Sequence, residues 1–215
     1  MNKVSSVLRL LTNPKRLKML MSFNHKGYFV DIGWFKSFDT KSAVDKDGNP
    51  IPWVTYPFID FIKERIKKQH TVFEFGSGNS TLFYAKYAGN VISVEHDRGW
   101  YDKIVNEKAE NSEMIFCELV YDGDYSQMPV KLGKKFDLII IDGRDRVNCC
   151  KSAPEALAEN GVIILDNSER PAYQAGIEFL VKRGYKHLFF SGIVPGLFYR
   201  VTTSIFYKEG NCLGL

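Results

Sequence analysis

Residues 71–81 read TVFEFGSGNST, and this stretch decides the fold. Its first five residues are mostly β-branched or aromatic, which is typical of a strand buried in a sheet. Two glycines, Gly76 and Gly78, come next, and a helix-forming region follows them. Glycine permits a tight strand-to-helix turn and leaves the backbone at the helix N-terminus open to a ligand. The stretch therefore predicts an α/β unit with a ligand at its turn.

The same alternation of strands and helices continues to the C-terminus, which is typical of a parallel sheet. We expect seven strands, at residues 71–75, 91–95, 114–120, 136–142, 162–166, 187–191 and 203–207. The link between the last two, residues 192–196, is too short for a helical crossover, so these strands should pair antiparallel. The predicted fold is a doubly wound, Rossmann-like α/β sheet, mostly parallel, with an antiparallel last strand.

An N-terminal extension, residues 1–56, precedes the predicted domain at residues 57–215. Its first apolar residues have the spacing of an amphipathic helix: Val4, Val7, Leu8 and Leu11. Asn13 and Pro14 fit the N-cap and first position of a second helix, whose apolar residues should face inward: Leu17, Leu20 and Met21. Residues 25–55 are rich in aromatic residues, with a turn expected at Asp47-Gly48. We expect this segment to pack as a lid on the domain.

Composition narrows the class of protein. The chain has 215 residues, 45% of them hydrophobic, which is enough for one core. No apolar run approaches the length of a membrane span, and the four cysteines lack the spacing of a metal site, so we expect a cytoplasmic protein with reduced thiols. Residues 1–30 carry six of the basic residues and no acidic one. This segment could contact an anionic surface, although a solvated helix face is the favoured interpretation.

The second strand ends in Glu95, at the separation from the glycine turn where a carboxylate reaches ribose hydroxyls in dinucleotide-binding folds. A nicotinamide site would also require a third glycine, and Thr81 occupies that position. The NAD pattern is thus broken. Glu74, beside the turn, suits a cationic ligand better than a phosphate. A sulfonium nucleoside satisfies both conditions.

From residue 71 to about residue 207 these motifs resemble those of class I S-adenosylmethionine-dependent methyltransferases. The resemblance rests on Glu74-x-Gly76-x-Gly78, on Glu95, on residues 136–142 ending in Asp-Gly, and on GVIILDN at residues 161–167. It implies S-adenosylmethionine as the cofactor. The methionine part would be held by the loop Glu74, Gly76, Ser77, Gly78, Asn79 and Ser80, the ribose by Glu95 with His96 beside it, and the adenine by Asp122 or Asp124. Ser80 departs from the family pattern, in which many members have a third glycine.

Three oxygen-bearing side chains follow the fourth and fifth strands, namely Asp142, Asp166 and Asn167. They could converge on Mg²⁺, which prefers such ligands, and the set resembles the divalent-metal site of catechol and caffeoyl-coenzyme A O-methyltransferases. The lysine that those enzymes place shortly after the first aspartate is missing here. Without a metal, these residues would cap helices or bind cofactor and substrate. We take Asp142 and Asp145 as candidate catalytic residues.

The sequence thus predicts an S-adenosylmethionine-dependent methyltransferase, with O-methylation of a small-molecule or glycan acceptor by in-line transfer favoured. Arg144, Arg146 and Arg170 follow the same strand ends, where they could hold a carboxylate, a phosphate or an acidic sugar, although surface solvation is the favoured interpretation for each one taken singly. No clear nucleic-acid motif is present. The alternatives are a nucleic-acid or protein methyltransferase and a non-catalytic nucleotide-binding protein of the same fold.

Overall fold

The computed structural model describes residues 12–215, so the first predicted helix, at residues 4–11, lies outside the described residues. Within them, seven strands form one sheet in the order β3-β2-β1-β4-β5-β7-β6. Only β7 runs antiparallel to its neighbours β5 and β6. The predicted fold class is therefore confirmed. The strands are β1 Thr71–Phe75, β2 Asn90–Glu95, β3 Ser112–Phe116, β4 Phe136–Ile141, β5 Leu157–Leu165, β6 Lys186–Val194 and β7 Leu197–Tyr207.

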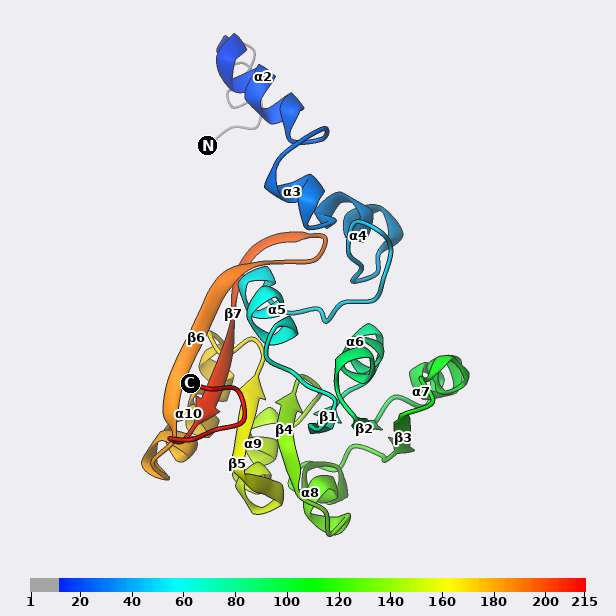
Figure 1. Ribbon diagram of the computed structural model, residues 1–215, viewed down its shortest axis with the longest axis vertical. Coiled ribbons are helices and arrows are strands. Elements are labelled where there is room, and N and C mark those ends of the chain that lie inside the picture. The colour runs from blue at the N-terminus through cyan, green and yellow to red at the C-terminus, as the bar shows by residue number, and fades with distance from the viewer. Residues whose placement is uncertain (1–11) are drawn as a thin grey trace.

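Helices cover both faces of the sheet (Figure 1). Side chains of α5 and α6 pack on one face, and those of α8, α9 and α10 pack on the other. Both faces are buried because parallel strands are linked by helical crossovers. The helices are α2 Pro14–Ser22, α3 Tyr28–Asp31, α4 Trp34–Thr40, α5 Tyr56–Lys63, α6 Asn79–Tyr87, α7 Arg98–Ile104, α8 Asp124–Lys131, α9 Arg146–Ala156 and α10 Gln174–Lys182, with 3₁₀ turns at Val105–Glu107 and Pro171–Tyr173.

The central strands separate two hydrophobic cores, one on each face of the sheet. In β4, Leu138 and Ile140 face the α5–α6 layer, whereas Ile139 and Ile141 face the α8–α10 layer. Successive side chains of a strand point to opposite faces, so an unbroken apolar run fills both cores at once. This arrangement leaves the polar residues that follow each strand at the carboxyl edge of the sheet.

Four strands differ from their predicted limits by more than one residue: β3, β5, β6 and β7. β5 begins at Leu157 instead of residue 162. β3 ends at Phe116 instead of continuing to residue 120. It is an edge strand that pairs only with β2, and β2 ends at Glu95, opposite Phe116. β6 and β7 are longer than predicted because the hairpin pairs as far as Val194 and Leu197, beyond the part of β7 that pairs with β5. The residues between them, which include Gly196 at φ +69°, form the short antiparallel link that was predicted.

The N-terminal extension is fixed to this hairpin. Trp34 is 2% exposed, and its Nε1 donates to the Leu197 carbonyl over 3.2 Å. Further toward the N-terminus, Asn13 caps α2 as predicted, accepting from the Arg16 backbone N–H. The prediction that Leu20 and Met21 face inward is wrong, because they are 41% and 62% exposed. Helices α2 and α3 lead away from the sheet (Figure 1), and α2 has no buried residue.

The described helices are all too short or too polar to cross a membrane.

Candidate functional site

A cavity of about 390 Å³ lies at the carboxyl ends of the central strands. This edge, where the crossovers diverge, is where open α/β sheets bind ligands, and the volume is in the range of small-molecule sites. The cavity is lined by Glu74, Gly76, Ser77, Ser80, Glu95, His96, Asp142, Gly143, Arg144, Arg146, Asn167, Arg170 and Tyr173. It thus gathers most of the residues predicted as a cofactor site.

The glycines at this edge allow the loops after β1 and β4 to touch. Gly76 has φ +95°, and a Cβ there would lie 3.4 Å from the Gly143 backbone. A Cβ on Gly143 would lie 2.0 Å from the Tyr125 hydroxyl, which is closer than any non-bonded contact allows. A side chain at Gly143 would therefore have to displace Tyr125 or the loop after β1. At Gly76 the space suffices for a Cβ, and the positive φ is what favours glycine.

Glu74 is 1% exposed and has one unsatisfied oxygen. Its Oε2 accepts from the Thr81 hydroxyl over 2.6 Å, whereas its Oε1 has no hydrogen-bond partner among the described residues. Burial raises the pKa of Glu74 to about 8. A buried acceptor that lines a cavity without a partner costs free energy until a donor arrives. The residue therefore fits a cationic or hydrogen-bond-donating ligand group.

Thr81, which breaks the nicotinamide pattern, has a structural role at this turn. Its hydroxyl donates to Glu74 and accepts from the backbone N–H of Gly78 over 3.1 Å. A glycine at this position could not make either bond. The threonine therefore holds the carboxylate of Glu74 at the loop.

Glu95 is 4% exposed at the end of β2. Its Oε1 accepts from the backbone N–H groups of His96 and Asp97, and its Oε2 accepts from the Ser77 hydroxyl over 2.8 Å. These bonds orient the carboxylate on the cavity wall. Each carboxylate oxygen has two lone pairs, so Oε2 can still accept from a ligand hydroxyl.

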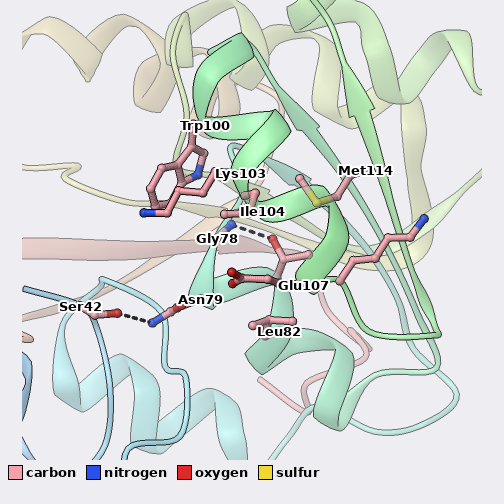
Figure 2. A pocket seen from close by; sticks show the side chains of 11 residues that line it. Ser42, Gly78, Asn79, Leu82, Trp100, Lys103, Ile104, Glu107 and Met114 are labelled. Atoms are coloured by element: carbon pink, nitrogen blue, oxygen red, sulfur yellow. Dashed lines mark hydrogen bonds between the residues drawn. The ribbon is translucent and has the colours of Figure 1, made fainter. Parts of the chain in front are cut away.

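Asn79 does not line this cavity, although it was predicted to bind the cofactor. Its side-chain amide donates to Ser42 Oγ over 2.9 Å and to the Ala43 carbonyl over 2.7 Å, which ties the N-terminal extension to the first turn of α6. Figure 2 shows this link at the rim of a separate cavity of about 290 Å³ between α6 and α7, where Trp100 lies over Gly78. None of the strand-end acids Glu74, Glu95 and Asp142 lines that second cavity.

Three other predicted site residues, Asp122, Asp124 and Asp145, lie outside the lining of this cavity. Asp122 and Asp124, expected near an adenine, do not line the cavity, and Asp124 instead forms an ion pair with Lys131. Asp145, a candidate catalytic residue, accepts from the Asp122 backbone N–H over 2.8 Å and from the Asn148 amide over 2.8 Å. Asp145 therefore joins the loops after β3 and β4. His96 and Arg144 occupy the cavity wall on that side.

Asp142 and Asp166 do converge, but on a guanidinium group. Arg146 Nη2 donates to Asp142 Oδ1 over 2.9 Å, and Arg146 Nη1 lies 3.8 Å from Asp166 Oδ2. The remaining donors of Arg146 go to the backbone carbonyls of Gly143, Asp142 and Asp166. Asp166 is 2% exposed and accepts from the Thr203 hydroxyl. Burial, followed by the neighbouring charge of Asp142, raises the pKa of Asp166 to about 8.

These contacts do not fit the predicted Mg²⁺ site. The guanidinium already supplies the positive charge between the two aspartates, and a cation placed there would lie against it. Asn167, the third predicted ligand, has φ +51° and lines the cavity. Across residues 12–215, no group of three or more His, Cys, Asp and Glu side chains could hold a metal ion.

Comparison with known proteins identifies the architecture. No family model and no curated protein sequence matches the chain. Many solved structures share its fold, among them the following three. Cofactor-bound Rv0187 from MTB is 17% identical over 93% of this chain and 99% of its own, with a TM-score of 0.58. Precorrin-6y C5,15-methyltransferase from Geobacter metallireducens GS-15 is 15% identical (80% and 96% covered, TM-score 0.57), and an rRNA methylase from Streptococcus thermophilus is 14% identical (69% and 92% covered, TM-score 0.52).

The chain has the class I methyltransferase fold. The antiparallel β7 between β5 and β6 agrees with this assignment. Two proteins with this fold are named for different acceptors, an rRNA and a precorrin, so the fold alone does not give the acceptor.

Some residues at this methyltransferase-type edge were missed or under-weighted by sequence reasoning. Arg146 was expected to be a solvated surface residue or a ligand for anions, whereas it forms an ion pair with Asp142, four residues earlier in the chain. Tyr173, whose ring faces the Arg146 guanidinium at 5.1 Å, gave no signal because the 3₁₀ turn that carries it has no sequence motif. Trp53 was grouped with the lid aromatics but lines two further cavities beside Asp142.

Proposed function

We propose that this protein is an S-adenosylmethionine-dependent methyltransferase that methylates a hydroxyl oxygen of a small-molecule or glycan acceptor. The unsatisfied Oε1 of Glu74 in the strand-end cavity is the observation that carries the proposal. The methyltransferase fold and the oriented carboxylate of Glu95 support it.

The residues of the cavity fit this cofactor group by group. Glu74 would accept from the positively charged methionine end, and the small residues Gly76, Ser77 and Ser80 leave room for it near the N-terminus of α6. Glu95 would accept from the ribose hydroxyls through Oε2. The adenine ring would occupy the side of the cavity formed by His96 and Arg144. The donor and acceptor chemistry of the wall thus matches a cationic nucleoside.

S-adenosylmethionine, when bound, supplies a methyl group on a sulfonium sulfur. The acceptor oxygen would attack the methyl carbon, with S-adenosylhomocysteine as the leaving group. Asp142 lines the cofactor cavity and both neighbouring cavities, so it lies where cofactor and acceptor meet. We assign it to orient the acceptor hydroxyl and take its proton while the new C–O bond forms. Arg146 fixes the orientation of that carboxylate. Alignment of two reactants is worth about 7–11 kcal/mol, so positioning carries most of the proposed catalysis.

Titration calorimetry with S-adenosylmethionine and S-adenosylhomocysteine tests the cofactor assignment, with NADH as the control ligand. Wild-type protein should bind both sulfur nucleosides and not NADH. Glu95→Ala should weaken both by about tenfold or more, since a charge-assisted hydrogen bond is lost. Glu113→Ala, on the exposed side of β3, is the matched control and should bind normally. Binding of NADH alone, or of none of these ligands, would overturn the proposal.

A further inference from the structure

Two cavities adjoin the proposed cofactor cavity at Asp142, and Trp53 borders both. One, of about 220 Å³, lies between Lys41 to Ala43 of the N-terminal extension and the loop at Ser77 to Ser80. The other, of about 540 Å³, lies between the loop at Asp166 to Arg170 and the β6–β7 hairpin. Because both meet the cofactor cavity at Asp142, together they form the space available to an acceptor. We call them the acceptor cleft.

The cleft presents flat aromatic surface. Trp53 is 45% exposed although the residues that follow it, Val54 and Thr55, are buried. The backbone there is fixed, since the Thr55 N–H donates to the Thr203 hydroxyl over 3.2 Å. The exposed face of Trp53 is therefore held in a fixed position beside both cavities. Tyr199, 73% exposed on β7, lines the cleft from the opposite side.

Among the described residues, the mouth of the cleft carries two guanidinium groups, those of Arg170 and Arg200, but only one carboxylate, that of Glu169. Arg200 makes no ion pair or side-chain hydrogen bond with any residue in 12–215. Arg170 makes one long ion pair, in which its Nε lies 3.9 Å from Glu169 Oε1. Glu169 in turn accepts from the Thr202 N–H. The two deeper acids, Asp142 and Asp166, are held by Arg146. The mouth of the cleft therefore has an excess of guanidinium groups.

We infer that the acceptor is an anionic, hydroxyl-bearing molecule, with a carboxylate or phosphate held by Arg170 and Arg200 and a ring face against Trp53. An acidic or phosphorylated sugar has this chemistry. Guanidinium groups bind both anions through paired hydrogen bonds, and the arrangement would direct a ring hydroxyl toward Asp142. The inference rests on the proposed function, because it assigns the second substrate of the same site.

Three matched probes test it: p-nitrophenyl β-D-glucoside, the corresponding glucuronide and the corresponding glucoside 6-phosphate. Their dissociation constants would be measured by ligand-observed NMR with and without saturating S-adenosylhomocysteine. At least one of the two anionic glycosides should bind about tenfold more tightly than the neutral glucoside, or better. Tighter binding of the glucuronide would indicate a carboxylate, and tighter binding of the 6-phosphate would indicate a phosphate. Arg200→Gln should remove most of this preference. The double substitution of Arg200→Gln with Arg170→Gln should remove the remainder. Arg183→Gln, after α10 at the opposite edge, should keep it.

Arg200 does not line the cofactor cavity, so Arg200→Gln should bind S-adenosylhomocysteine with wild-type affinity. This separates the two proposals. If the wild-type protein does not bind S-adenosylhomocysteine, the proposed function is overturned. The preference for anionic glycosides is judged separately, from the dissociation constants measured without S-adenosylhomocysteine. Equal binding of all three glycosides, binding of none, or a preference that survives the double substitution would overturn the inference.

Discussion

Arg146 and Asp142 form a largely buried ion pair at the end of β4, with Nη2 donating to Oδ1 over 2.9 Å. The Arg146 side chain is 8% exposed and that of Asp142 is 24% exposed. The same guanidinium also donates to three backbone carbonyls. A fixed positive charge thus stands beside the point where the cofactor cavity and the acceptor cleft meet.

Arg146→Met should lower the free energy of unfolding by about 3–5 kcal/mol, because it leaves buried carboxylates and carbonyls without their donor. Arg183→Met, at an exposed site, should change it by less than about 0.5 kcal/mol. Urea unfolding followed by circular dichroism measures both. A loss below about 1 kcal/mol in Arg146→Met would show that the ion pair is not important for stability.

Removal of divalent metal should leave the site intact. Since Arg146 occupies the space between Asp142 and Asp166, we expect equal S-adenosylhomocysteine affinity in EDTA and in millimolar Mg²⁺. Calorimetry in the two buffers gives the comparison. An affinity that rises about tenfold or more with Mg²⁺ would restore the metal site predicted from the sequence.

Cofactor binding should depend on pH through Glu74. Burial raises its pKa to about 8, so the free protein holds a proton there at pH 6, whereas a cationic ligand favours the carboxylate. Affinity should therefore rise between about pH 6 and pH 8, approaching tenfold per unit, and level off above it. Calorimetry in buffers of different ionisation enthalpy should detect proton release at pH 7. Glu74→Gln should abolish that release, and proton release that persists in the variant would refute the assignment.

The stability of the ligand-free protein should change in the opposite direction. Glu74 has a pKa of about 8 in the folded protein, against 4.5 for a solvent-exposed glutamate side chain such as that of the unfolded chain. Between these two pH values the folded state therefore binds one proton more than the unfolded state. Its contribution to stability is present below pH 4.5 and is lost as pH rises toward 8. The urea midpoint should fall over this range, and Glu74→Gln should flatten the slope. An identical slope in both proteins would contradict this assignment.

Asn79→Ala should loosen the N-terminal extension. It removes the bonds to Ser42 and Ala43, so amide hydrogens of residues 41–53 should exchange faster. Asn111→Ala is the matched control, because it loses comparable bonds to the carbonyls of Ala85, Ala88 and Gly89, away from the site. Hydrogen exchange followed by mass spectrometry distinguishes them. Equal exchange of residues 41–53 in both variants would mean that the link does not hold the segment.

The strand pattern of the fold could be predicted from the sequence because each central strand is an apolar run bounded by polar residues. The strand-end acids Glu74, Glu95 and Asp142 were expected together for the same reason, since parallel strands end at one edge. Asp122 and Asp124 could not be placed, because they follow an edge strand whose end depends on the length of β2. In α2, the apolar spacing was visible, but no spacing reveals whether a partner surface exists, and Leu20 and Met21 are exposed.

The bonds from Asn79 to Ser42 and Ala43 have a thermodynamic consequence. Asn79 begins α6, directly after the glycine loop, and the segment that it holds forms one wall of the acceptor cleft. A ligand that restrained the loop would also restrain that wall through the Asn79 amide. By linkage, an acceptor that restrained the wall would raise affinity for the ligand at the loop by the same factor. The two proposed substrates would then bind with positive cooperativity.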